Sequence, residues 1–251
     1  MGGSSVTVAL ALALGGCNVV FGVDPGEGTP GDGPVHSCAG IEVADGLIGW
    51  WPLTTVNQGR VPACKGPDGI CADGTCPTVE NTGPFGGALR FGAGRFVEIP
   101  GQPLVTGPVV TVAFWLRSDT DTTEYTCPVN KLHGDMGYNT WQLCLDQRFP
   151  TSGWVDAANV AHTLMTPAYQ TRKWTHIAMR WDGSAAVVDV DGLLRAASGS
   201  TGIVDDGSPI VLGADRDNSN ELSWLEGALA DVRIYNRFLT NEEIMQLASV
   251  L

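Results

Sequence analysis

The sequence predicts an all-β domain that ends in a short helix, and two observations at its carboxyl end lead to that prediction. Residues 225–237 (LEGALADVRIYNR) contain an apolar and polar alternation that is typical of a strand with one buried face. Residues 238–251 follow, and Thr240 and Glu243 stand three places apart, as in the capping box that satisfies amide donors at a helix start. With 251 residues and 43% hydrophobic residues the chain can bury one substantial core, and all-β sandwiches of this length commonly form a single domain.

The amino-terminal residues resemble a bacterial lipoprotein signal peptide. Residues 6–17 (VTVALALALGGC) are uncharged and apolar, too short for a lasting transmembrane helix, and end in small residues before Cys17. LGGC resembles the lipobox, which implies cleavage before Cys17 and acyl chains on that residue, and several acyl chains hold a protein on a membrane. Residues 1–5 lack the Lys or Arg of a signal peptide, so the alternative is an uncleaved apolar segment with a spare cysteine. We therefore expect a signal peptide over residues 1–17.

The following residues predict a tether to an exported domain. Residues 18–37 are dense in Gly, Pro, Asp and Glu and cannot bury enough apolar surface to fold. The chain has a net charge of −13 and a pI near 4.5, which argues against nucleic acid or an anionic membrane surface as a partner. The sequence thus predicts a protein of the bacterial envelope, at the outer membrane or the cell surface, that contacts the membrane through its lipid anchor only.

Six upstream segments carry strand patterns in a fixed order. They are residues 46–53 (GLIGWWPL), 86–100 (GGALRFGAGRFVEIP), 110–119 (VTVAFWLRSD), 173–183 (KWTHIAMRWDG), 187–197 (VVDVDGLLRAA) and 209–215 (PIVLGAD). Together with the closing strand and helix, they resemble the LamG-like jelly-roll family within the concanavalin A-like lectin/glucanase superfamily. The resemblance implies a two-sheet antiparallel jelly-roll sandwich over residues 38–251. Such sandwiches carry many unrelated activities, so function must be argued from a site.

The cysteines predict disulfides. Apart from Cys17 the chain has an even set of six: Cys38, Cys64, Cys71, Cys76, Cys127 and Cys144. Residues 124–132 and 139–146 are typical of the two arms of a hairpin, which would bring Cys127 opposite or nearly opposite Cys144. We expect that pair. The pairing of the other four cysteines stays open, and one local bridge together with one bridge from Cys38 is a plausible arrangement. Zinc binding by Cys64, Cys71 and Cys76 is the alternative, which their wide spacing disfavours.

The sequence contains no motif for catalysis. Hydrolysis of a glycosidic bond needs two carboxyl groups, and laminarinase-like members of the superfamily carry them as E-x-D-x-x-E, which this chain lacks. Asp189 and Asp191 alternate in VVDVDG, but Asp191-Gly192 is typical of a hairpin turn, which leaves Asp189 alone. We therefore predict that the protein is not an enzyme, with a divergent glycoside hydrolase or lyase as the weakest alternative.

Calcium is the only cofactor that the residues indicate. In the resembling family an acid of the closing strand binds a structural calcium, and here that position falls on Ala230, with Asp231 one place on. A different candidate is the stretch DRDNSNELSWLE, which has oxygen-bearing side chains at places 1, 3, 5 and 12 of a calcium-loop pattern but lacks its turn glycine. The candidate ligands are Asp215, Asp217, Ser219 and Glu226. The alternative is a solvated loop between strands.

Aromatic residues supply the candidate ligand-binding side chains. Of the eight tryptophans, five lie in apolar strand patterns that favour core packing: Trp50, Trp51, Trp115, Trp174 and Trp181. Four other aromatic residues lie near turns or in polar context, where a ring can stack on a sugar: Tyr138, Trp141, Trp154 and Trp224. We therefore predict a non-catalytic module that binds a polysaccharide, another glycan or a surface protein. The alternative is an envelope lipoprotein that serves structure or protein contacts without a glycan ligand.

Overall fold

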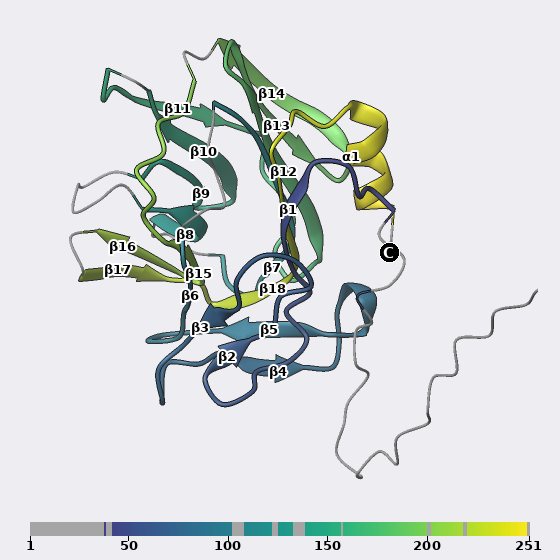
Figure 1. Ribbon diagram of the computed structural model, residues 1–251. Coiled ribbons are helices and arrows are strands. Elements are labelled where there is room, and N and C mark those ends of the chain that lie inside the picture. Colours follow the sequence, from purple (N-terminus) through teal and green to yellow (C-terminus); the bar gives the residue numbers. More distant parts are fainter. Residues whose placement is uncertain are drawn as a thin grey trace, which may run out of the picture. The chain divides into compact units, whose positions relative to one another are not determined.

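The computed structural model describes residues 38, 42–101, 108–121, 125–132, 139–156, 158–199, 202–217 and 220–249 (Figure 1). All of them belong to one compact unit, residues 33–251. Cys17, the expected signal peptide and the whole of the expected tether, residues 18–37, lie outside the described residues. The strands of the described part form two eight-stranded antiparallel sheets and a two-stranded hairpin, and a short α-helix lies near the carboxyl end. This confirms the predicted jelly-roll sandwich.

We name the two large sheets A and B. Sheet A runs in the order β14 (Leu193–Gly199), β13 (Ala185–Val190), β12 (Thr175–Asp182), β7 (Val109–Ser118), β18 (Gly227–Tyr235), β5 (Ala88–Phe91) and β4 (Thr78–Glu80), and β1 (Leu47–Trp51) also pairs with β18. Sheet B runs β11 (Ala161–Met165), β10 (Phe149–Val155), β9 (Trp141–Asp146), β8 (Tyr125–Lys131), β15 (Ile210–Leu212), β6 (Val97–Ile99), β3 (Gly69–Ile70) and β2 (Arg60–Val61). The separate hairpin is β16 (Ala214–Asp217) and β17 (Asn220–Trp224), and a 3-10 turn spans Pro84–Gly86.

The core lies between the two sheets and is rich in large aromatic side chains. Phe114 and Trp181 come from sheet A, Trp141 and Trp154 come from sheet B, and all four belong to one cluster of buried residues. Each of them is at most 2% exposed, so these four rings contribute to the hydrophobic stabilisation of the sandwich.

The helix α1 (Asn241–Ala248) covers part of the outer side of sheet A (Figure 1). Its Ile244 and Leu247 pack into a second buried cluster with Trp50. The start of the helix is set by Thr240, whose hydroxyl accepts from the Glu243 amide while the Glu243 carboxylate accepts from the Thr240 amide. The capping box predicted from the sequence is confirmed. No helix among the described residues is long and apolar enough to cross a membrane.

The closing strand β18 differs from its prediction in two ways. It is buried along its whole length, because elements pack on both sides of it, whereas the sequence predicted one exposed face. Its alternation is also interrupted at Asp231, which has φ of 52°, and the pairing with β7 shifts between Ala230 and Arg233. This β-bulge places Leu229 and Val232, which are three residues apart, in the same core cluster. Asp231, one place after the family's calcium position, accepts hydrogen bonds from Trp50 and Arg233 in this bulge.

A buried ion pair joins sheet A to the segment that leads into α1. Arg180 of β12 donates from Nε and Nη2 to the two carboxylate oxygens of Asp189 on β13, both at 2.7 Å. The same guanidinium donates from Nη1 to the Leu239 carbonyl at 2.8 Å and from Nη2 to Asn241 Oδ1 at 3.0 Å. Both charged side chains are 1% exposed, so Asp189 holds the fold together and is not presented to a substrate.

Three disulfides are present among the described residues: Cys38–Cys64, Cys71–Cys76 and Cys127–Cys144. The last joins β8 to β9, the two arms of the hairpin expected from the sequence. The first two are the arrangement with one local bridge and one bridge from Cys38. All three zinc-ligand candidates are therefore used in disulfides.

Candidate ligand-binding face of sheet B

The outer face of sheet B carries a row of exposed and partly exposed side chains across three neighbouring strands. Asp146 of β9 pairs with Tyr125 of β8 on one side and with Phe149 of β10 on the other. Leu145 points into the core, so its neighbour Asp146 and both paired residues lie on the outer face. Tyr125 is 43% and Phe149 37% exposed, and two strand spacings separate them by about 10 Å. The row therefore offers two aromatic rings with a carboxylate between them.

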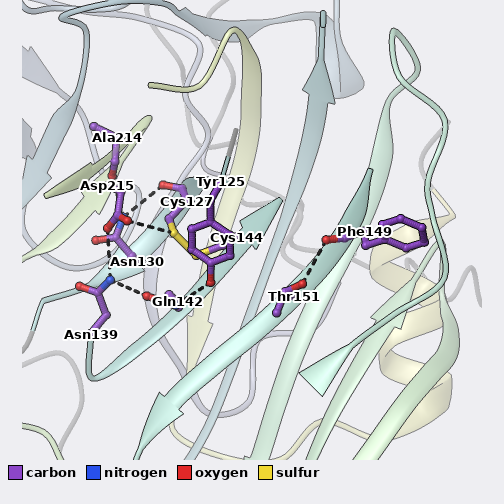
Figure 2. Close-up of a disulfide and its surroundings, with 10 residues drawn as sticks. All are labelled: Tyr125, Cys127, Asn130, Asn139, Gln142, Cys144, Phe149, Thr151, Ala214 and Asp215. Atoms are coloured by element: carbon purple, nitrogen blue, oxygen red, sulfur yellow. Dashed lines mark hydrogen bonds between the residues drawn. A yellow bond between two sulfur atoms is a disulfide. The ribbon is translucent and has the colours of Figure 1, made fainter. Parts of the chain in front are cut away.

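Amide side chains form a second row behind the first (Figure 2). Gln142 of β9 donates from Nε2 to the Tyr125 hydroxyl at 3.1 Å, and its Oε1 accepts from Asn139 Nδ2 at 2.6 Å. On β10 the residue opposite Gln142 is Gly153, where a Cβ atom would lie 2.9 Å from Gln142 Cγ. Gly153 therefore leaves the space that the Gln142 side chain occupies, and this amide is fixed beside the Tyr125 ring.

A buried polar cluster supports this amide row. Asn139 Nδ2 also donates to Asp215 Oδ1 at 3.3 Å, and Asn130 Nδ2 donates to the carbonyls of Ala214 at 2.7 Å and Cys127 at 3.2 Å (Figure 2). Cys127 Sγ lies 3.4 Å from Asp215 Oδ2, which is a contact between dipoles, because a disulfide sulfur has no proton to donate. The Cys127–Cys144 disulfide thus forms a rigid floor under the polar face.

The structure corrects two of the aromatic candidates. Trp141 is 0% and Trp154 is 2% exposed, and both belong to the core cluster, so neither ring is available for stacking on a ligand. Trp154 packs instead against His162, with ring centroids 5.3 Å apart. The strand parity explains the error, because Trp141 is one residue from the outward-facing Gln142. Pairing across strands, which the sequence did not disclose, selects Tyr125 and Phe149 in their place.

The other two aromatic candidates are not part of this row. Trp224 of β17 is partly buried, pairs with Ala214 and lies 6.3 Å from Phe96 between ring centroids. Tyr138 lies outside the described residues, as does the rest of the segment 133–138.

The candidate calcium ligands do not converge in the part of the chain that the structure describes. Asp215 contacts Asn139, whereas the Glu226 carboxylate accepts from the Ala93 amide at 3.1 Å, and the segment between them forms the hairpin β16–β17. Ser219 and the side chain of Asp217 lie outside the description. Among the described residues no group of three or more His, Cys, Asp or Glu side chains is placed to hold a metal ion. The described residues on either side of 218–219 form the hairpin β16–β17.

The acid next to the family's calcium position is also engaged within the protein. Asp231 accepts from Trp50 Nε1 at 2.7 Å and from Arg233 Nε at 3.0 Å. The Arg233 guanidinium lies 5.0 Å from the centre of the Trp50 ring, so these three side chains form one buried cluster.

With this geometry established, comparison with known proteins identifies the family. Residues 91–245 match the family model of the concanavalin A-like lectin/glucanases superfamily. The chain belongs to this superfamily. It carries a LamG-like domain, as the sequence resemblance implied, and the match runs from the last residue of β5 into α1.

Solved structures show the same fold at low sequence identity. The binding domain of Paraclostridial Mosquitocidal Protein 1 has a TM-score of 0.64 at 14% identity, over 81% of this chain and 52% of that one. The receptor binding domain of botulinum neurotoxin D has a TM-score of 0.61 at 14% identity, over 82% of this chain and 52% of that one. Trypanosoma rangeli sialidase has a TM-score of 0.59 at 17% identity, over 82% of this chain and 33% of that one. The chain thus spans about half the length of the toxin domains and a third of the sialidase.

Proposed function

We propose that this protein is a non-catalytic recognition module of the bacterial envelope that binds carbohydrate through the outer face of sheet B. The observation that carries the proposal is the row Tyr125, Asp146 and Phe149 with Gln142 behind it. An aromatic ring stacks on the apolar face of a sugar, and carboxylate and amide groups bond its hydroxyls. The two rings are far enough apart to contact two different sugars of one chain.

The solved structures of similar fold support recognition as the function. Two of them are named as a binding domain and a receptor binding domain of toxins, and the third is a sialidase. On the candidate face the side chains are suited to holding a ligand, and Asp189, the acid that the sequence left for catalysis, has both oxygens bonded by Arg180. Binding of a surface protein on the same face is the second candidate, because Tyr125 and Phe149 are also typical of protein interfaces.

We further propose that the module is exported and held on the membrane by acyl chains on Cys17. Residues 1–17 would be the signal peptide, residues 18–37 the tether and residues 38–251 the LamG-like domain. The lipobox-like LGGC supports the anchor. The three disulfides support export, because disulfides persist in oxidising compartments and are rare in the cytosol.

The test is binding of the full-length protein, purified in a mild detergent, to an array of polysaccharides and glycans, with calcium and again with a chelator. We expect binding that weakens on Gln142→Ala and on Phe149→Ala, with the folded state of each variant checked by its thermal midpoint. Leu193→Ala is the matched control, because Leu193 is 51% exposed but lies on β14 of sheet A. If the protein binds no glycan on the array in either condition, the proposal of glycan binding is refuted. The remaining candidate is then a lipoprotein that contacts other proteins.

A further inference from the structure

A second candidate site lies outside the row of Tyr125, Asp146 and Phe149. It is a pocket of about 420 Å³ between the segment 167–174, the start of β12 and the turn that joins β13 to β14. Buried parts of Tyr169 and Val190 line it, and exposed polar side chains surround them. This volume falls within the range of small-molecule sites, roughly 300 to 1,000 Å³. An apolar lining with a polar rim suits a ligand that has one apolar face and several hydroxyls.

The rim is cationic, although the protein is strongly acidic. Lys173 and Arg195 line the pocket, both are exposed, and neither forms an ion pair with any carboxylate in the described part of the chain. Asp191 is the acidic residue of the lining, and its Oδ1 accepts the His176 amide at 2.9 Å, which holds it at the β13–β14 turn. Two positive charges against one negative charge leave a single positive charge to be neutralised. A ligand with one carboxylate matches this balance, and Arg binds a carboxylate through paired hydrogen bonds.

A wall of the pocket is formed by Trp174, which is held in place from outside. The Arg117 guanidinium lies 5.3 Å from the centre of the Trp174 ring. Arg117 in turn donates from Nη2 to Glu80 at 2.9 Å and from Nε to Asp119 at 2.7 Å. The hydrogen bond from Arg117 holds the pKa of Glu80 below its usual range, so this cluster stays ionised at neutral pH. The indole is therefore a preorganised surface, of the kind on which a sugar ring stacks.

We propose that this pocket binds a carboxylated sugar of the uronic acid class. The carboxylate meets Arg195 and Lys173, and the sugar ring lies against Trp174 over the apolar lining. The site shares no lining residue with the row of Tyr125, Asp146 and Phe149, so it does not depend on the function proposed for sheet B.

The experiment is calorimetric titration of the full-length protein in detergent with glucuronate and galacturonate, and with glucose and galactose as the matched neutral sugars. We expect each uronate to bind at least about tenfold more tightly than its neutral counterpart, because the carboxylate adds charge-assisted hydrogen bonds. Arg195→Gln should weaken uronate binding about tenfold or more. Arg172→Gln is the control, because Arg172 is also exposed and is next in sequence to Lys173 but does not line the pocket.

Three further outcomes decide the proposal. Equal affinity for uronate and neutral sugar would overturn it, as would equal losses in Arg195→Gln and Arg172→Gln. Acetate or inorganic phosphate binding as tightly as the uronates would mean an anion site without sugar recognition, and would also overturn it. The glycan array with Gln142→Ala reports on the sheet B face, whereas the uronate titration with Arg195→Gln reports on this pocket, so failure of one site is distinguished from failure of the other.

Discussion

Replacing Asp189 by Asn should strongly destabilise the protein, because it leaves the charge of Arg180 buried without its counter-charge. The two side chains are 1% exposed and share two hydrogen bonds of 2.7 Å. Asn keeps the size of Asp and one acceptor oxygen, so the substitution removes the negative charge and one acceptor without creating a cavity. The other partners of Arg180, the Leu239 carbonyl and Asn241 Oδ1, are neutral and cannot balance the charge.

The expected magnitude follows from the burial of the pair. Removing one partner of a buried ion pair costs about 3 to 5 kcal/mol of the free energy of unfolding. For a domain of this size each kcal/mol lowers the thermal midpoint by about 2 to 4 °C, so Asp189→Asn should lower it by about 6 to 20 °C. Because Arg180 also bonds the residues that begin α1, loss of the helix should accompany the transition.

The assay is urea and thermal unfolding followed by far-ultraviolet circular dichroism, with all disulfides kept oxidised. Glu98→Gln is the control: Glu98 pairs with Arg216 at 2.9 Å, but its side chain is 44% exposed, so the loss should stay below about 1 kcal/mol. The double variant Arg180→Met with Asp189→Leu should recover much of the stability, because it removes both buried charges. A loss below about 1 kcal/mol in Asp189→Asn would refute the reasoning and mean that water reaches Arg180.

Three other predictions concern a covalent bridge and two titrating groups. Cys127→Ala with Cys144→Ala opens a bridge across 17 residues and should lower the free energy of unfolding by about 3 kcal/mol in non-reducing urea titrations, and an unchanged midpoint would contradict this. Burial and the charge of Arg233 lower the pKa of His176 to about 3. Between pH 6.5 and about pH 3 the His176 ring is therefore protonated in the unfolded state and neutral in the folded state. Stability should therefore fall by about 1.4 kcal/mol per pH unit as pH drops below 6.5, and His176→Phe should remove this slope in urea titrations at several pH values; equal slopes would contradict it. The hydrogen bonds from Arg237 lower the pKa of Glu243, so this carboxylate stabilises the fold above pH 4.5 and the effect is lost as pH falls further. Glu243→Gln should reduce the fall of the thermal midpoint below pH 4.5. An unchanged fall would mean that the pair of Arg237 and Glu243 contributes nothing to stability.

The local features of this protein were readable from the sequence because neighbouring residues produce them. Thr240 and Glu243 lie within hydrogen-bonding reach whenever the helix starts between them, whatever else surrounds it. Asp191 and Gly192 both have positive φ, of 51° and 76°, and form the hairpin turn that this pair predicts. The hairpin spacing likewise brought Cys127 to Cys144. The order of such elements was sufficient to indicate the superfamily.

The tertiary structure decided which side of each strand meets the core and which strands lie side by side. The bulge at Asp231 reverses the alternation of inward-facing and outward-facing side chains along β18, and no residue pattern in that strand predicts the bulge. Trp141 has polar neighbours in the sequence and yet is buried, because a single-residue step separates the two faces of a strand. The row of Tyr125, Asp146 and Phe149 exists only through pairing of three strands. Short-range chemistry thus determined the elements, whereas sites built from side chains distant in sequence required the packing of the two sheets.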